Sequence, residues 1–307
     1  MKTPNTKIPN IKSTRPSRRH VHRVLKVTWV LLLFQSVALL GETLDQRVDV
    51  GGFELQARVI GEGTPAVVFE AGGGDGIEAW GDLPAEVARS TRVIVYDRAG
   101  LGVSDLGPEP RSARRVAEEL HTLLTALEIP PPYLLVGHSL GGLYIRAFAQ
   151  LHPKKVAGFV FLDVTTEGMH RSLGTEEGWR QYEAQLQDFG LGLRAESLML
   201  WQNLLALEAF DPPPDRPAVV ISGAAPPQIP EDQRPALEAL GIDEERLREL
   251  QQKKIRLHGE LVGKLPQGTQ VLAEKSGHYV HHDESQKILQ EILRVLGACR
   301  DHSDSEP

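Results

Sequence analysis

The chain has 307 residues, of which 41% are hydrophobic and 24% charged, and its formal net charge is −7. This composition is typical of a globular protein with a large core and excludes a disordered or fibrous chain, while the length fits one large α/β domain with tails. Eight basic residues and no acid precede Val27, so the rest of the chain carries −15 and has no basic face for nucleic acid.

Residues 1–44 combine this basic start with an apolar segment, Val27–Leu40. Its length of about 14 residues fits the apolar region of a signal peptide and falls short of the roughly 20 that span a membrane. Ala38 and Gly41 do not have the spacing of a cleavage site, so an uncleaved anchor that associates with the membrane is the alternative. We expect an exported (periplasmic or secreted) or membrane-anchored protein rather than a cytoplasmic one.

Short apolar runs then predict the strands of a sheet. Alternating residues in 47–50 and 53–59 flank Gly51-Gly52 and predict a β-hairpin. Further buried strands are predicted at Ala66–Phe69, Val93–Tyr96, Tyr133–Val136, Gly158–Leu162, Ala218–Ser222 and Gln270–Ala273. Because helical patterns lie between most of these strands, the sheet is predicted to be a parallel α/β sheet within a domain of residues 45–299.

The helices are predicted from apolar periodicity. One stripe begins at Val116 and ends at Leu127, and residues 140–150 form a second helix. Asp283 with Gln286 resembles a capping box, which predicts a final amphipathic helix before the polar tail 300–307. The single cysteine, Cys299, cannot form an internal disulfide and is expected to be a packed thiol on this helix.

The alternation of strands and helices breaks over residues 164–217, where we expect a helical lid. Insertions beyond the carboxyl ends of strands often build substrate pockets. Apolar lid residues therefore either face a ligand or simply pack the lid, and the second interpretation is the ordinary one for a helical stripe. These residues are Leu198, Leu200, Trp201, Leu204 and Leu205.

The strongest chemical motif is Gly137-His138-Ser139-Leu140-Gly141. It follows a predicted strand and opens a predicted helix, which is the context of a nucleophile elbow. In that turn the Ser139 hydroxyl is exposed and the helix N-terminus offers N–H groups to a developing oxyanion. The alternative is a tight turn in which Ser139 has no catalytic role. The setting favours Ser139 as a nucleophile.

With this motif the sequence resembles the α/β-hydrolase superfamily over Val48 to about Leu296. The resemblance implies a mostly parallel eight-stranded sheet flanked by helices, with a helical lid insertion. Residues 96–105 look like the family's loop after strand 4, where Asp97 and Arg98 are expected to serve structure rather than chemistry.

The resemblance also implies that His278 is the general base, because Ser276-Gly277-His278 follows the last strand and precedes the final helix. Its imidazole could take the Ser139 proton if a carboxylate orients the other ring nitrogen. His281 and His282 beside Asp283 raise the alternative of a metal site, but sequential residues converge poorly on one ion.

The acid of the triad is open between two regions of the chain. Many relatives place it after strand 7, where this sequence has Glu231 and Asp232 only late in the loop. Asp163 ends strand 6 directly, and some relatives use that position. Since neighbouring strands lie about 4.8 Å apart, Asp163 could reach His278, and we prefer it.

For the oxyanion hole, one donor is expected to be the backbone N–H of Leu140 and the other that of Gly73, in the loop after strand 3. Two carboxylates flank that loop, Glu70 and Asp75. They could disfavour anionic substrates, or Asp75 could merely cap a helix.

These residues together predict a serine hydrolase that cleaves carboxylic esters or related small-molecule acyl substrates through an acyl-enzyme. No metal or organic cofactor is implied. An acyltransferase or a carbon–carbon bond hydrolase would use the same triad, and a non-catalytic ligand receptor or scaffold is the alternative from another class. The sequence leaves the oligomeric state open.

Overall fold

The computed structural model describes residues 43–166, 168, 190–208, 215–227 and 243–303. All of them belong to one compact unit, Gly41–Pro307. The predicted signal or anchor segment Val27–Leu40 lies outside the described residues, as do Glu231, Asp232 and much of the predicted lid. No helix within the described ranges is long and apolar enough to cross a membrane.

The centre of the unit is an eight-stranded sheet with the order β1-β2-β4-β3-β5-β6-β7-β8. Its strands are β1 Thr43–Asp49, β2 Glu54–Ile60, β3 Ala66–Glu70, β4 Val93–Tyr96, β5 Tyr133–His138, β6 Val156–Leu162, β7 Pro217–Gly223 and β8 Gln267–Ala273. β1 and β2 are antiparallel to their neighbours, and the other pairs are parallel. The predicted hairpin and all the predicted strands are confirmed.

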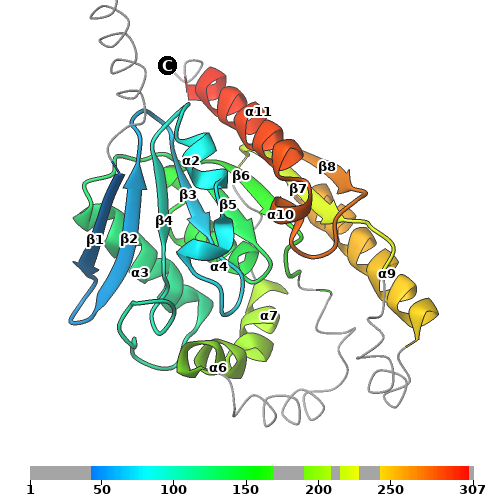
Figure 1. Cartoon of the computed structure of the whole chain (residues 1–307), viewed down its shortest axis with the longest axis horizontal. Helices are drawn as coiled ribbons and strands as arrows, with labels where there is room; N and C mark the ends of the chain where they lie inside the picture. The colour runs from blue at the N-terminus through cyan, green and yellow to red at the C-terminus, as the bar shows by residue number, and fades with distance from the viewer. Residues whose placement is uncertain (1–42, 167, 169–189, 209–214, 228–242, 304–307) are drawn as a thin grey trace, which may run out of the picture. The chain divides into compact units, whose positions relative to one another are not determined.

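Helices cover both faces of this sheet (Figure 1). They are η1 Ile77–Trp80, α2 Leu83–Val87, α3 Ala113–Ala126, α4 Gly141–Leu151, η2 Pro153–Lys155, α6 Leu191–Leu198, α7 Leu200–Glu208, α9 Glu244–Gly263, α10 Val280–Asp283 and α11 Ser285–Ser303. Side chains of α2 and α11 form one hydrophobic cluster with one face of the sheet. Side chains of α3, α4, α7 and α9 join the cluster on the other face. The sheet is therefore buried on both sides, which explains why its inner strands are continuous apolar runs.

The α3 helix illustrates how the sequence pattern becomes packing. Its N-cap, Ser112, accepts a hydrogen bond from the N–H of Arg115 at 3.2 Å. The predicted stripe is buried on the sheet, with Val116 and Leu120 almost inaccessible to solvent. Each such buried aliphatic side chain contributes about 1.5–3 kcal/mol relative to exposure.

The predicted capping box at the start of the last helix is wrong. Asp283 lies inside the short helix α10, and its Oδ2 accepts from the N–H of Gly277 instead of capping α11. The carboxylate thus stabilises the loop before α10. Cys299 is packed as expected: its thiol donates to Ala157 O at 3.3 Å, and burial raises its pKa to about 12.

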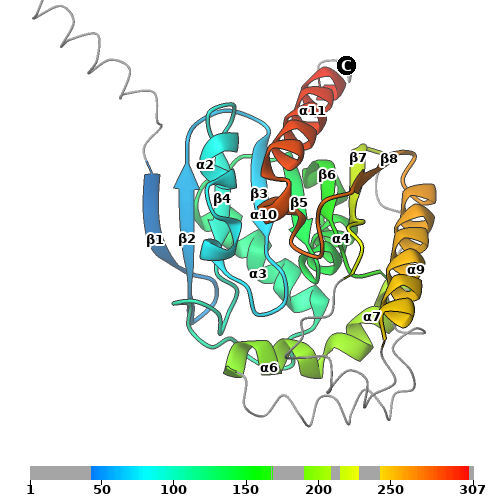
Figure 2. The same cartoon turned by 45° about the vertical axis from the view of Figure 1, so that its right-hand side comes forward.

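The helices α6 and α7 lie beyond the carboxyl ends of the parallel strands (Figure 2). They are the described part of the predicted insertion. Leu204 is fully buried and Leu200 packs against the core, whereas Leu198 and Leu205 are exposed. The apolar residues of this segment therefore divide between core and surface, and Leu204 follows the ordinary packing interpretation.

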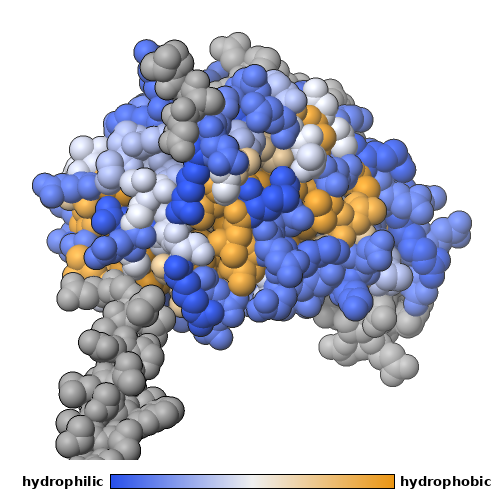
Figure 3. Space-filling view, turned by 90° about the horizontal axis from the view of Figure 1, so that it is seen from above, coloured by the Kyte–Doolittle hydropathy of each residue, from blue (hydrophilic) through white to orange (hydrophobic). Residues whose placement is uncertain are grey.

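One face of the molecule is mainly hydrophilic, with hydrophobic residues gathered in small patches between charged ones (Figure 3). Apolar atoms make up a large share of any protein's surface, so small patches of this kind are normal. We therefore look for function at the carboxyl edge of the sheet rather than on this face.

Candidate active site

Ser139 lies on the sharp turn between β5 and α4. Its φ is +50°, a left-handed conformation that is uncommon for a residue other than glycine. The Ser139 N–H donates to Leu162 O at 3.1 Å, which ties the turn to the neighbouring strand β6. A Cβ on Gly141 would overlap the carbonyl oxygen of Glu70, so only glycine permits this approach of α4 to the loop after β3. A strained backbone conformation like that of Ser139 is characteristic of turns at functional sites.

The structure brings Ser139, His278 and Asp163 into one chain of hydrogen bonds. Ser139 Oγ lies 2.9 Å from His278 Nε2, and His278 Nδ1 lies 2.8 Å from Asp163 Oδ2. An ionised carboxylate only accepts hydrogen bonds, so Nδ1 carries the proton and Nε2 is free to accept from the serine hydroxyl. This is the arrangement of a nucleophile, a base and an orienting acid.

Asp163 follows β6 directly and its side chain is fully buried. Oδ1 accepts from the N–H of Gly223 at 2.8 Å, while Oδ2 accepts from His278 and also from Lys254 Nζ at 2.7 Å. Burial raises the pKa of Asp163, but the hydrogen bond from His278 and the charge and hydrogen bond of Lys254 outweigh burial and leave the pKa below its usual value. The carboxylate is thus held ionised.

The loop that carries His278 is fixed from several sides. His138 Nε2 donates to the backbone oxygen of His278 at 3.0 Å, and the two rings lie 4.7 Å apart. Burial lowers the pKa of His138 to about 3, so this ring stays neutral beside the base. His138 therefore supports the backbone of His278 from within the elbow.

Gly73 and Leu140, the residues of the two expected oxyanion donors, lie close together. A Cβ on Gly73 would sit 3.3 Å from Leu140 Cδ2, so the loop after β3 closely approaches the elbow. Among the described residues, neither the Leu140 N–H nor the Gly73 N–H donates to another backbone group. Unpaired N–H groups at a helix N-terminus and a glycine loop are the kind that stabilise a developing oxyanion.

A buried ion cluster lies beneath this loop and centres on Arg98. Its guanidinium pairs with Glu196 and with Glu70, and it also donates to the backbone oxygens of Ala71 and Gly72. Burial opposes the charge of Arg98, but Glu196 and Glu70 outweigh it and keep the pKa of Arg98 well above its usual value. Arg98 is structural, as expected, and it holds the loop after β3, which carries the expected donor Gly73.

The same cluster ties α6 to the loop. Glu196 Oε2 accepts from the N–H of Gly74 at 3.2 Å, and a Cβ on Gly74 would contact Leu193 at 3.2 Å. Tyr96 donates its hydroxyl to Glu70, whose pKa is raised by burial. The sequence signalled Arg98 through its motif, but nothing in the sequence pointed to Glu196.

Asp75 does not cap a helix, so that alternative is wrong. The N-cap of η1 is Gly76, and Asp97 Oδ1 accepts from the N–H of Ile77 at 2.7 Å in the place where Asp75 was expected. The Asp75 carboxyl instead lies near His278 and Tyr279, with Oδ2 3.8 Å from His138 Nδ1, and burial raises the pKa of Asp75. It is therefore an acidic group at the edge of the site.

A metal site was the alternative prediction for His281 and His282, but the rings of both residues have other partners in the structure. Both Nε2 atoms donate to Ala79 O, at 3.1 Å from His281 and at 2.8 Å from His282. Burial lowers the pKa of His281 to about 4. Across the part of the chain that the structure describes, no three His, Cys, Asp or Glu side chains converge to hold a metal.

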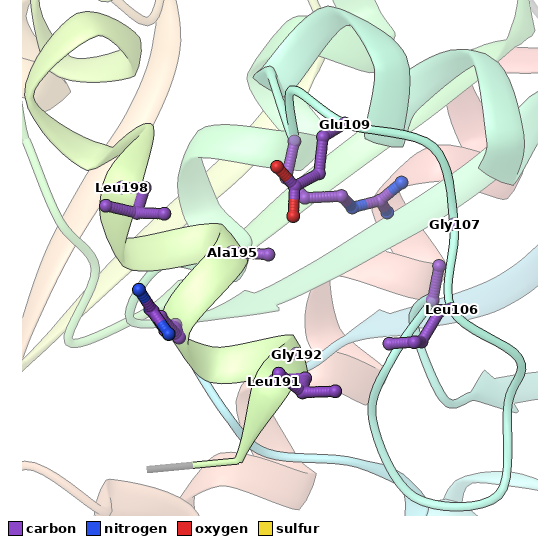
Figure 4. A pocket seen from close by; sticks show the side chains of 10 residues that line it. Leu106, Gly107, Glu109, Leu191, Gly192, Ala195 and Leu198 are labelled. Atoms are coloured by element: carbon purple, nitrogen blue, oxygen red, sulfur yellow. The ribbon is translucent and has the colours of Figure 1, made fainter. Parts of the chain in front are cut away.

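A cavity of about 330 Å³ lies between α6 and the loop after β4 (Figure 4). Leu106, Leu191 and Leu198 line it, together with the carboxyl of Glu109. No member of the Ser139, His278 and Asp163 group is among its lining residues. The Ser139 hydroxyl therefore does not line this cavity.

Comparisons with known proteins agree with the observed fold. Residues 65–206 match a family model described as "alpha/beta hydrolase fold". The chain is 37% identical over 128 residues to the "Probable transporter efuK" of Hormonema carpetanum, covering 39% of this chain and 18% of that protein. It is 39% identical over 101 residues to the "Putative carbamate hydrolase RutD" of Pseudomonas savastanoi pv. phaseolicola, covering 32% of this chain and 38% of that protein.

Both matches span less than half the length of the relative. Among solved structures, a thermophilic esterase from Thermogutta terrifontis superposes with a TM-score of 0.57 at 16% identity, covering 84% of this chain and 99% of that chain. At this identity the likeness concerns the fold alone.

Proposed function

We propose that the chain, which has the α/β-hydrolase fold, is an enzyme of that superfamily and more specifically a serine hydrolase acting on carboxylic esters or related acyl substrates. The observation that supports this proposal is the hydrogen-bonded chain from Ser139 Oγ through His278 to Asp163. Some members of the superfamily use an enzyme carboxylate as the nucleophile and form an ester on it. A serine nucleophile disfavours that chemistry and favours transfer of an acyl group to water.

In the proposed reaction, His278 Nε2 takes the proton of Ser139 as Oγ attacks the acyl carbonyl. The N–H groups of Leu140 and Gly73 stabilise the oxyanion that forms. His278 then gives the proton to the leaving group. In the second half, His278 takes a proton from water as the water oxygen attacks the acyl-enzyme, and it then returns that proton to Ser139 Oγ as the acid leaves.

The electrostatic surroundings support a preference among substrates. Asp75 lies at the edge of the site near His278, so a negative charge on the substrate near this carboxylate would be repelled. We therefore expect neutral esters to react faster than esters that carry a carboxylate close to the scissile bond. Short p-nitrophenyl esters are suitable first substrates.

The experiment that tests the proposed function is labelling by a fluorophosphonate probe, with p-nitrophenyl acetate hydrolysis measured in parallel. Wild type should label and turn over the ester, whereas Ser139→Ala and His278→Ala should lose labelling and at least about 10³-fold in kcat/KM. Ser303, at the end of α11, supplies a matched control, because Ser303→Ala changes the same residue type far along the chain.

A folded wild type that neither labels nor hydrolyses esters would contradict the proposal and favour a receptor or scaffold. Circular dichroism establishes folding independently of activity. If labelling succeeds but water is a poor acceptor, product analysis with added alcohols or amines distinguishes an acyltransferase from a hydrolase. Hydrolysis of a diketone substrate to a carboxylic acid and a ketone would instead identify carbon–carbon bond cleavage.

A further inference from the structure

One face of α9 lies against the loops that hold the triad acid. Gln251, Lys254 and His258 are three and four residues apart and so share one side of the helix. His258 is fully buried, with its Nδ1 2.8 Å from Ser222 Oγ and its Nε2 donating to Val164 O at 2.8 Å. Gln251 donates to the backbone after β7. The helix is thus anchored on both sides of Lys254.

Lys254 makes the contact that concerns the chemistry. Its Nζ lies 2.7 Å from Asp163 Oδ2, the same oxygen that accepts from His278 Nδ1 at 2.8 Å. The Asp163 side chain is fully buried and that of Lys254 is 21% exposed, so water screens this pair only weakly. The triad acid therefore has a cation on one side and the base on the other.

We propose that Lys254 is a positioning residue that extends the activation of Ser139 to lower pH, because its charge offsets that of Asp163 next to His278. This inference rests on the proposed serine hydrolase function. A buried carboxylate stabilises the protonated imidazole, and a protonated His278 cannot accept the Ser139 proton. The ammonium of Lys254 opposes that protonation, so the base stays neutral and competent in more acidic solution.

Other titratable groups also face His278 from the elements packed around it. They are His138 of the elbow, Asp75 after β3, Tyr279 next in sequence, His281 of α10 and His258 of α9. Burial lowers the pKa of His138 to about 3 and that of His281 to about 4, so both are neutral where the enzyme would work. None of these groups is altered in a Lys254 variant.

The test measures the rate of fluorophosphonate labelling of the full chain as a function of pH. Lys254→Met removes charge and hydrogen bond, Lys254→Gln keeps a donor without charge, and Lys254→Arg keeps the charge. The first two should move the midpoint of the acidic limb upward by on the order of one pH unit. Lys254→Arg and the neighbouring control Lys253→Met should keep the wild-type midpoint. If Lys254→Met does not fold, Lys254→Gln supplies the comparison.

A merely structural role would lower the labelling rate equally at every pH and leave the midpoint unchanged, and that result in folded Lys254→Met and Lys254→Gln would overturn the inference. The titration of the His278 ring signals by NMR is a second readout, which does not depend on turnover. If wild type does not label at any pH, the proposed function fails. The NMR midpoint then still decides whether Lys254 opposes protonation of His278.

Discussion

The guanidinium of Arg98 joins three parts of the molecule that are distant in sequence: the loop after β3, the loop after β4 and α6. It is 1% exposed, pairs with Glu70 and Glu196, and lies 5.1 Å from the ring centroid of Tyr144. Removing one member of such a buried group leaves the opposite charges without compensation, which costs more than the net contribution of the intact pair.

We therefore expect Arg98→Met to lower the free energy of unfolding by about 3–5 kcal/mol and to slow fluorophosphonate labelling, because the loop that carries Gly73 loses its support. Urea denaturation measures the first effect. The matched control is Arg114→Met, whose exposed pair with Glu118 should contribute at most about 1 kcal/mol. Equal stability of the two variants would show that the buried cluster does not hold the loop.

At the scale of single residues, local motifs were enough for part of the site. Ser139 was predictable because the elbow is a turn encoded by its own five residues, and Asp163 because it follows a buried strand directly. The contacts of Lys254 with Asp163 and of Glu196 with Arg98 span 91 and 98 residues of sequence. Charged residues on amphipathic helices are ordinarily solvated, so nothing local distinguished these two.

Among the elements, α4 and the loop after β3 depend on each other. The helix begins at Gly141, where a side chain would overlap the Glu70 carbonyl. Gly141→Ala should destabilise the protein by about 1–3 kcal/mol and reduce labelling, because loop and elbow must move apart. Thermal unfolding and labelling measure the two effects.

Gly297 provides the control for this prediction, since a Cβ there meets nothing within 4 Å on α11. Gly297→Ala should leave labelling intact and stabilise the helix by up to about 1 kcal/mol. A labelling rate in Gly141→Ala equal to that of wild type would mean that the loop adapts without losing its geometry.

The order of elements was predictable, whereas the start of the last helix was not. Hydrophobic runs define the strands because both faces of the inner sheet are covered. The capping box predicted at Asp283 is wrong because the Asp283 carboxylate accepts from the N–H of Gly277, in the loop that carries His278. In addition, a separate helix, α10, precedes α11. A local rule cannot anticipate a competing partner supplied by the turn.

For the whole molecule, export or anchoring through residues 1–44 stays a prediction. We expect the full chain to partition with membranes or to appear outside the cytoplasm in cell fractionation. Leu32→Arg combined with Phe34→Arg places two charges in the apolar segment, each costing about 2.5–3.5 kcal/mol at the centre of a membrane helix. That variant should remain with cytoplasmic markers. Co-fractionation of the unaltered chain with those markers would contradict the prediction.

The spacing of the triad along the chain has a consequence for biosynthesis. Ser139 and Asp163 are in place once β5 and β6 have formed, but the base is on the loop after β8, which is the last strand of the sheet. A ribosome-bound chain that ends before this loop holds an ordinary serine hydroxyl. Under the proposed function, Ser139 gains its base only when β8 docks beside β7, so activation of the hydroxyl waits for the last strand of the sheet.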